Sequence, residues 1–223
     1  MANNIGAILF DLDGTLIDTR SRFFLTFNKS FKKFNLPPLT QSIFDNYYRN
    51  ASLDKLVPEG IEIRFWDYFL ESYSKTSTPE EFRIPGSKQA LYQLKKRGIG
   101  IGVVTGRISS VKNVLTELKK HELDQFVDVV ISRSKNQNIN EDYFSKEQNL
   151  LEALGKLGHR PFESMFVGDY IFDIRSGKKI GAVTVAVLSG GIKKEILARE
   201  NPDFILESVA ELPRIISELN NSH

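Results

Sequence analysis

Carboxylates stand directly after two apolar segments of this 223-residue chain. Asp11 and Asp13 follow the apolar run at residues 7–10, within the sequence Asp-Leu-Asp-Gly-Thr. Asp169 follows the run at residues 165–167, and Asp173 comes shortly after it. A carboxylate can attack phosphorus as a nucleophile, and a neighbouring carboxylate can give and take a proton. These residue types therefore favour phosphoryl transfer through a covalent intermediate.

A third polar segment, Thr105-Gly106-Arg107, follows the apolar run at residues 99–104. The hydroxyl of Thr105 and the N–H of Gly106 are suited to hold a phosphate oxygen, although the same pair could instead cap the next helix. Lys146 precedes a helical stripe and offers a cation to the same phosphate, with Lys135 as the alternative lysine.

Several carboxylates at one edge of a sheet need a cation between them. Two carboxylates about 4 Å apart repel each other by roughly 4 kcal/mol at an effective dielectric constant near 20. The cluster offers oxygen ligands without histidine or cysteine, which favours a hard ion, and Mg²⁺ is the usual partner of a phosphate. We therefore expect a Mg²⁺ cofactor, which together with Lys146 would neutralise a phosphomonoester dianion.

The expected reaction divides the work between Asp11 and Asp13. Asp11 attacks phosphorus and forms an acyl phosphate, whereas Asp13 protonates the leaving oxygen and later deprotonates a water molecule. Asp173 is expected to orient the loops or to contact the waters of the metal. Gly14 lets the backbone turn and brings N–H groups near the phosphate. The residues expected to bind the substrate are Gly14, Thr15, Thr105, Gly106 and Arg107.

Short apolar runs recur along the chain and predict buried strands of a parallel sheet. Amphipathic helical stripes separate them, and Ser145 with Gln148 predicts a capping box at the start of one helix. This alternation predicts an α/β fold, with a Rossmann-like parallel sheet and helices on both faces. Ligands bind beyond the carboxyl ends of such strands, where the polar residues stand. The predicted strands are residues 7–10, 99–104, 127–131, 165–167, 182–188 and 204–206, and the helices between them include residues 89–96, 111–118 and 150–157.

Residues 19–83 interrupt this alternation. The segment is rich in Phe, Tyr, Lys and Arg, contains helix-like stretches near residues 20–34, 40–50 and 61–75, and shows no buried strand. Prolines and glycine punctuate it. We interpret it as a helical domain inserted after the first strand, so that residues 1–18 and 84–223 form a discontinuous α/β core.

The composition narrows the partners. The formal net charge is only +2, so the sequence gives no reason to expect nucleic acid or a membrane as partner. No apolar run approaches the roughly 20 residues that span a bilayer. The chain has no cysteine, which excludes disulfides and a thiol nucleophile and fits a reducing compartment. We expect a cytoplasmic protein, either a monomer or a homodimer.

The ordered motifs resemble those of the haloacid dehalogenase superfamily of phosphohydrolases. By this resemblance, Asp11 is the nucleophile and Asp13 the acid and base. Asp11, the backbone carbonyl of Asp13, and Asp169 would hold Mg²⁺, and Thr105 and Lys146 would bind the phosphoryl group. Residues 19–83 would be a helical cap similar to that of phosphoglycolate-phosphatase-like members, with hinges near residues 17–20 and 83–85. The residues that carry the resemblance are Asp11 to Leu16, Val103 to Arg107, Lys146, Val167 to Asp169, and Asp173.

Three other functions remain open at this point. A dehalogenase would not need Asp13 as an acid, so the presence of Asp13 favours phosphoryl chemistry. A phosphomutase would use the same Asp11 and pass the phosphoryl group to a sugar hydroxyl. A non-catalytic binding module would be expected to have lost one of the motif carboxylates, and none is lost. The expected substrate is a small phosphorylated metabolite of the phosphoglycolate, sugar phosphate or nucleotide class.

Overall fold

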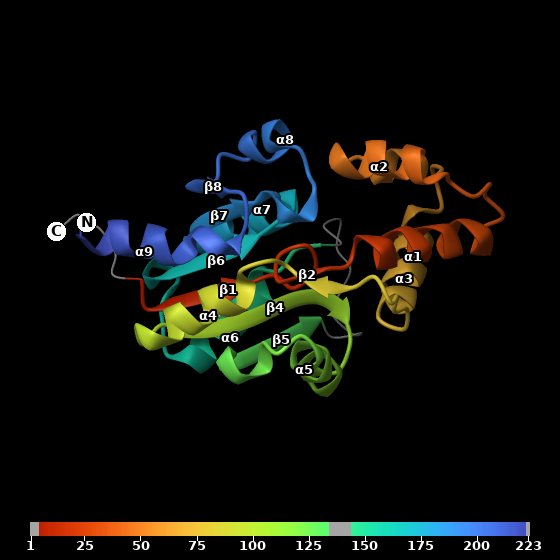
Figure 1. Cartoon of the computed structure of the whole chain (residues 1–223). Coiled ribbons are helices and arrows are strands. Elements are labelled where there is room, and N and C mark those ends of the chain that lie inside the picture. Colours follow the sequence, from red (N-terminus) through yellow and green to blue (C-terminus); the bar gives the residue numbers. More distant parts are fainter. Residues whose placement is uncertain (1–4, 134–143, 222–223) are drawn as a thin grey trace.

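The computed structural model describes residues 5–133 and 144–221. Its centre is a six-stranded sheet with parallel neighbours, in the order β5-β4-β1-β6-β7-β8 (Figure 1). The predicted α/β fold with a Rossmann-like parallel sheet is confirmed. The strands are β1 (Ala7–Phe10), β4 (Gly100–Ile108), β5 (Val129–Arg133), β6 (Ser164–Gly168), β7 (Val183–Val187) and β8 (Phe204–Leu206).

The central strand β1 is covered on both faces. Ile8 and Phe10 belong to one apolar cluster, and Ala7 and Leu9 belong to another. Successive side chains of a strand point to opposite faces, so the two clusters lie on opposite sides of the sheet. All four residues are at most 1% exposed. The uninterrupted apolar run in the sequence follows from this two-sided burial.

Helices cover both faces of the sheet. The helices α6 (Glu147–Leu157) and α7 (Ile171–Ile180) pack on the face of Leu9, where Leu150 and Leu154 of α6 join its cluster. The helices α4 (Ser87–Lys96), α5 (Val111–Lys120) and α9 (Leu212–Asn221) contribute to the opposite cluster. The short helix α8 (Lys194–Ala198) follows β7 and packs near α7.

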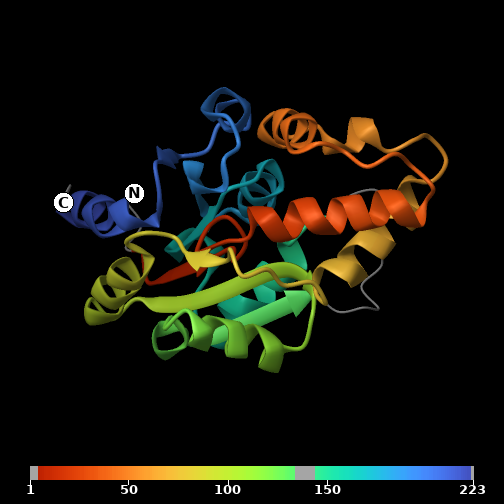
Figure 2. The same cartoon turned by 45° about the vertical axis from the view of Figure 1, so that its right-hand side comes forward.

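The segment of residues 19–83, called the insert below, contains three helices. These are α1 (Arg20–Lys33), α2 (Gln41–Arg49) and α3 (Glu62–Tyr73), at the three predicted positions. Two short antiparallel strands that the sequence did not predict, β2 (Ile17–Asp18) and β3 (Phe82–Arg83), join the two ends of the insert. Both views place α1, α2 and α3 together beyond one end of the sheet (Figures 1 and 2).

Aromatic side chains hold the insert together. Phe27, Phe44 and Phe65 are fully buried, and Trp66 meets Phe65 edge to face at 5.4 Å between ring centroids. The same cluster includes Ile174 of α7, so apolar contact continues from the insert into the α/β part. Burying such rings contributes about 25 cal/mol per Å² of apolar surface, which explains why the insert is so rich in Phe.

The ends of two predicted elements differ from expectation. β4 continues to Ile108, so Thr105, Gly106 and Arg107 lie inside the strand, where its register with β5 shifts. The predicted capping box at Ser145 and Gln148 is wrong, because Lys146 is the N-cap of α6. The hydroxyl of Ser145 instead donates to the carboxylate of Glu147, one residue into the helix.

Short 3₁₀ turns connect several elements: η1 (Leu53–Leu56), η2 (Asp124–Phe126), η3 (Pro161–Glu163), η4 (Leu188–Gly190) and η5 (Val209–Glu211). Within residues 5–133 and 144–221, the structure contains no helix that is both long and apolar enough to cross a membrane.

Candidate active site

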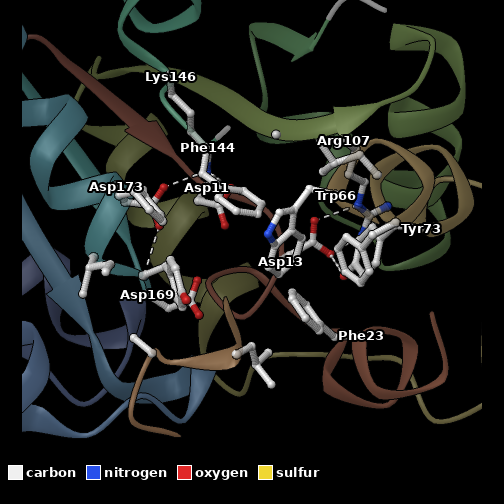
Figure 3. A pocket seen from close by; sticks show the side chains of 18 of the residues that line it. Asp11, Asp13, Phe23, Trp66, Tyr73, Arg107, Phe144, Lys146, Asp169 and Asp173 are labelled. Carbon is white, nitrogen blue, oxygen red and sulfur yellow. Dashed lines mark hydrogen bonds and ion pairs between the residues drawn. The ribbon is translucent and has the colours of Figure 1, made fainter. Parts of the chain in front are cut away.

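The carboxyl ends of β1, β4 and β6 form the floor of the site. Asp11 comes directly after β1, and its N–H donates to the carbonyl oxygen of Val167 in β6 at 2.8 Å. Asp169 comes directly after β6. Because β1 pairs with both β4 and β6, the residues that follow these strands reach one place in space. Figure 3 shows Asp11, Asp13, Asp169, Asp173 and Lys146 around the same pocket.

Lys146 reaches the site from the start of α6. Its Nζ donates to Asp11 Oδ1 at 2.5 Å and to Asp173 Oδ1 at 2.7 Å (Figure 3). The N–H of Lys146 donates to Ser176 Oγ of α7 at 3.0 Å, which fixes the start of α6 against α7. The Lys146 side chain is only 10% exposed. The alternative lysine, Lys135, lies outside the described residues.

Asp173 lies in the first turn of α7. Its Oδ2 accepts from the N–H of Tyr170 at 3.1 Å, whereas its Oδ1 faces Lys146. One carboxylate thus caps the helix and orients the lysine at the same time. Asp169 does not cap α7, because Tyr170 is the N-cap, and Asp169 Oδ1 instead accepts from the hydroxyl of Thr15 at 3.1 Å.

The buried carboxylates provide the ligands that a hard divalent cation prefers. Asp11, Asp169 and Asp173 each offer one oxygen within 4.8 Å of the others, and all three are at most 5% exposed. A single lysine leaves this cluster with excess negative charge. Oxygen ligands at such a density fit Mg²⁺ or a similar cation, and the site is built from residues that the sequence analysis singled out.

Burial and mutual repulsion perturb the acids of this cluster. Burial, with the nearby charges of Asp173 and Asp13, raises the pKa of Asp11 to about 7, although Lys146 acts in the opposite direction. Burial and the charge of Asp11 raise the pKa of Asp169 well above its usual range. Burial alone would lower the pKa of Lys146, but the carboxylates of Asp11 and Asp173 outweigh it and raise that pKa. A bound cation would relieve the repulsion between the acids.

Asp13 faces a different set of partners from Asp11. The guanidinium of Arg107 donates from Nε to Asp13 Oδ2 at 2.7 Å and from Nη2 to Asp13 Oδ1 at 2.5 Å. The hydroxyls of Thr19 and Tyr73 also donate to Asp13 Oδ1, each at 2.8 Å. Burial would raise the pKa of Asp13, but Arg107 outweighs burial and holds this pKa well below its usual range. Asp13 is therefore a carboxylate in this arrangement.

Arg107 links Asp13 to a buried chain of charges. Its guanidinium also donates to Glu117 of α5, and Glu117 accepts from Arg22 of α1 at 2.9 Å. Arg22 in turn forms a bidentate pair with Glu81, with bonds of 2.7 and 2.5 Å. The network joins the insert, which supplies Arg22 and Glu81, to β4 and α5 of the core. The sequence analysis predicts that Arg107 binds the substrate; in the structure its guanidinium is bonded to Asp13 and Glu117.

Glycines leave room for the carboxylate of Asp169. Gly14 has a positive φ of 77°, and a Cβ atom at this position would collide with Asp169. A Cβ atom at Gly190, in the turn after β7, would collide with the same carboxylate. The hydroxyl of Ser189 donates to the carbonyl oxygen of Gly14 at 2.8 Å and ties the two turns together. Neither glycine tolerates a side chain while Asp169 keeps its place.

The residues of the predicted Thr105-Gly106-Arg107 segment differ in whether they line the pocket. Gly106 lies beside Lys146, where a Cβ atom would be 3.7 Å from its Cε, and it lines the pocket together with Arg107. Thr105 is fully buried, and its hydroxyl accepts from the N–H of Arg107 at 3.3 Å. The alternative of a helix cap is wrong for Thr105 and Gly106, because Ser110 is the N-cap of α5.

Sequence reasoning missed several residues of the site. Thr19 and Tyr73 bond to Asp13, and Glu117 bonds to Arg107; Thr19 and Glu117 lie near the motifs in sequence, whereas Tyr73 is 60 residues from Asp13. Gly190 had a usable signal, because Ser-Gly-Gly follows a predicted strand, as the other site residues do. No comparable signal marks Tyr73, since its position depends on how α3 packs.

A cavity of about 480 Å³ lies above these carboxylates. Its floor includes Asp11, Lys146 and Asp169, and the insert supplies Trp66 and Tyr73 to its wall (Figure 3). Lys193, between β7 and α8, contacts the insert at the end of α2: its N–H donates to Arg49 O, and its Nζ donates to Asn50 Oδ1, both at 2.9 Å. The insert therefore contacts the core at the segment between β7 and α8 as well as through the charge network of Arg22 and Glu117.

Comparisons with known proteins agree with this fold. The family described as haloacid dehalogenase-like hydrolase matches residues 8–187. A protein of Clostridium perfringens that carries the name of the pyrophosphatase PpaX is 31% identical over 97% of this chain and 100% of its own length. The pyrophosphatase PpaX of Bacillus cereus (strain AH820) is 28% identical over 98% of this chain and 99% of its own length. A solved hydrolase of the haloacid dehalogenase-like family from Streptococcus pneumoniae has a TM-score of 0.76 at 20% identity, covering 95% of this chain and 98% of that one.

The fold and the family match define an α/β hydrolase, in agreement with the hydrolase that the sequence predicts. The chain belongs to the haloacid dehalogenase-like hydrolase family.

Proposed function

We propose that this protein is a Mg²⁺-dependent phosphatase that hydrolyses a small phosphomonoester through a phospho-aspartate on Asp11. The observation that carries the proposal is the buried contact of Lys146 with both Asp11 and Asp173, beside Asp169. A strand end that gathers a nucleophilic carboxylate, a cation and a cluster of metal-type ligands has the parts that phosphoryl transfer needs.

In the proposed mechanism, Asp11 attacks phosphorus while the bond from phosphorus to the leaving oxygen breaks. Water then attacks phosphorus, the bond to Asp11 breaks, and phosphate leaves. Lys146 holds the phosphoryl oxygens and Asp173 holds Lys146. Thr105 and the N–H groups of Gly106 and Thr15 are proposed to contribute further donors, whereas the N–H of Gly14 donates to the carbonyl oxygen of Ile17 at 2.8 Å.

Asp13 moves the protons in this scheme. The carboxylate form, which Arg107 stabilises here, is suited to take the proton of the attacking water. To protonate the leaving oxygen in the first half-reaction, Asp13 must first leave Arg107, take up a proton from solvent and then contact the leaving oxygen. Thr19 and Tyr73, which belong to the insert, are positioned to guide that exchange. Arg107 keeps its pairing with Glu117 while Asp13 moves.

Asp11, Asp169 and the backbone carbonyl of Asp13 would hold Mg²⁺, and Asp173 supports the site from its place beside Lys146. When bound, the cation supplies charge neutralisation for the phosphoryl oxygens. The crowded carboxylates and the raised pKa of Asp11 support this assignment, because both favour binding of a cation between the acids.

The insert is proposed to act as a cap that selects the substrate and limits water. Its two connections run through β2 and β3, which form a short ribbon beside the motif that holds Asp13. Such a ribbon can serve as a hinge while the helices of the insert move as one body. The cysteine-free sequence supports the cytoplasm as the compartment in which the enzyme works.

The test is hydrolysis of p-nitrophenyl phosphate by the wild type and by Asp11→Asn, with Mg²⁺ and with EDTA. We expect release that requires Mg²⁺ and disappears in Asp11→Asn. Trapping of beryllofluoride in the presence of Mg²⁺ provides a readout independent of turnover. A wild type that neither hydrolyses the ester nor binds beryllofluoride would refute the proposal. Transfer to an added sugar phosphate in preference to water would identify a mutase instead.

A further inference from the structure

The cavity above the carboxylates has a polar floor and aromatic walls. Eight of the described residues that line it are aromatic. Phe23 and Trp66 come from the insert, whereas Phe144 and Phe172 come from the α/β core (Figure 3 labels the first three). Trp66 meets Phe144 edge to face at 5.2 Å, and Phe144 lies 5.3 Å from Phe172, so the rings form one wall across both parts.

The volume of the cavity exceeds what a phosphoryl group needs. Pockets of about 300–1,000 Å³ with mainly apolar lining typically bind drug-sized ligands, and this cavity measures about 480 Å³. Several rings of the wall, Phe23, Phe144 and Phe172 among them, are only partly buried and thus accessible to a ligand. An apolar ring placed against them would be removed from water and could stack or pack edge to face.

The charges of the cavity disfavour a second anionic group. The described lining contains three cations, and each is already bonded to carboxylates. Lys146 contacts Asp11 and Asp173, Arg107 contacts Asp13 and Glu117, and Arg175 contacts Glu200 at 2.6 Å.

Two further carboxylates, Asp54 and Glu62, line the cavity from the insert. Together with Asp11, Asp13, Asp169 and Asp173, they give the described lining six carboxylates. The three cations and one bound divalent ion would supply five positive charges, so one negative charge would remain. A second phosphate or a carboxylate on the substrate would face this excess of like charge, which penalises such substrates against a neutral one.

Resting on the proposed phosphatase activity, we propose that the substrate is a phosphomonoester whose leaving group carries an uncharged aromatic ring. The phosphoryl group lies on the polar floor, and the ring lies between Phe23, Trp66 and Phe144. This class differs from pyrophosphate, the substrate in the names of the PpaX relatives, and from small phosphocarboxylates such as phosphoglycolate.

The first test compares benzyl phosphate with propyl phosphate, since both release an alcohol and only one has a ring. We expect kcat/KM for benzyl phosphate to be at least tenfold higher than for propyl phosphate, pyrophosphate or phosphoglycolate. Phe144→Ala should lower kcat/KM for benzyl phosphate about tenfold and that for propyl phosphate less than threefold. Phe162→Ala, which removes an exposed ring away from the cavity, is the matched control and should change neither.

The second test measures binding without turnover. Trp66 is the only tryptophan of the chain and lies in the cavity wall, so its fluorescence reports directly on a bound ligand. With Mg²⁺ present, benzylphosphonate should give a saturable change in emission at concentrations where phosphonoacetate gives none. Phe144→Ala should weaken the binding of benzylphosphonate about tenfold.

The outcomes separate this inference from the proposed function. Preferred hydrolysis of pyrophosphate or phosphoglycolate would overturn the aromatic substrate class and leave the phosphatase mechanism in place. Saturable binding of benzylphosphonate without hydrolysis of any ester would support the ligand class while refuting the phosphatase. Equal emission changes with benzylphosphonate and phosphonoacetate would overturn the inference.

Discussion

Replacing Lys146 with Met isolates the contribution of one buried cation to stability and catalysis. Lys146 bonds to Asp11 at 2.5 Å and to Asp173 at 2.7 Å, and its side chain is 10% exposed. Removing one partner of a buried ion pair leaves uncompensated charge and costs roughly 3–5 kcal/mol of unfolding free energy. For a chain of this size, that loss corresponds to a fall in melting temperature of roughly 6–20 °C.

The same helix supplies a matched control. Lys156 bonds to Glu152 at 2.7 Å, but both side chains are 54% exposed. An exposed pair of this kind contributes at most about 1 kcal/mol, because water and salt screen it. Lys156→Met therefore removes the same type of side chain at nearly the same pair distance, and the difference between the two variants measures the effect of burial.

The destabilisation in Lys146→Met should grow with pH. Asp11 has a pKa of about 7 in the folded protein and an ordinary value of 3.8, so its contribution to stability is fully present below about pH 4 and is lost as the pH rises through about 7. Lys146 lowers the pKa of Asp11, and the variant should therefore hold this proton to higher pH. Above pH 7 the wild type no longer loses stability through Asp11, whereas the variant loses up to about 1.4 kcal/mol per pH unit.

The assay is urea denaturation in EDTA at pH 6, 7, 8 and 9, with the wild type and both lysine variants. We also expect kcat of Lys146→Met with Mg²⁺ to fall roughly 10²–10³-fold, because one charged donor to the phosphoryl oxygens is lost. Unfolding free energies of the two variants that agree within 1 kcal/mol across this pH range would refute the assigned role of the buried cation.

Two other predictions test the packing around the site and the charge network. Gly190→Ala places a Cβ atom against the Asp169 carboxylate, so Mg²⁺-dependent activity should fall at least tenfold in initial-rate measurements. The control is Gly155→Ala, whose Cβ atom would lie in open space on α6. This variant should leave activity unchanged and, in thermal melts, stabilise the protein by roughly 0.5–1 kcal/mol. Glu81→Gln leaves Arg22 without its bidentate carboxylate and should cost roughly 3 kcal/mol in urea denaturation, and a cost below 1 kcal/mol would contradict a structural role for this buried pair.

The sheet was predictable because a strand that is buried on both faces needs an uninterrupted run of apolar residues, which is visible in the sequence. Each strand of the core is a short apolar run followed by polar or glycine residues, and the run at residues 204–206 even has the observed bounds. The helices of the insert were predictable from their stripes of aromatic residues. The ends of β4 were not, because Thr105, Gly106 and Arg107 continue the strand with polar side chains.

The placement of the charged residues was only partly predictable. Asp11, Asp169 and Lys146 come together because the carboxyl ends of parallel strands meet at one edge, which is a rule of topology. The partners of Asp13 depend on how α1 and α3 of the insert pack against β4, and no local pattern encodes that packing. Arg22 illustrates the limit, since it looks like an exposed helix residue in sequence and is 4% exposed in the structure.

The formation of phospho-aspartate tests the central proposal most directly. The enzyme is mixed with substrate and Mg²⁺, quenched with acid within the first turnovers, and its peptides are analysed by mass spectrometry. We predict one phosphoryl group on the peptide that contains Asp11, absent with EDTA and absent in Asp11→Asn. Turnover of the wild type without any phosphorylated Asp11 peptide, together with turnover retained in Asp11→Asn, would contradict the account and indicate direct attack by water.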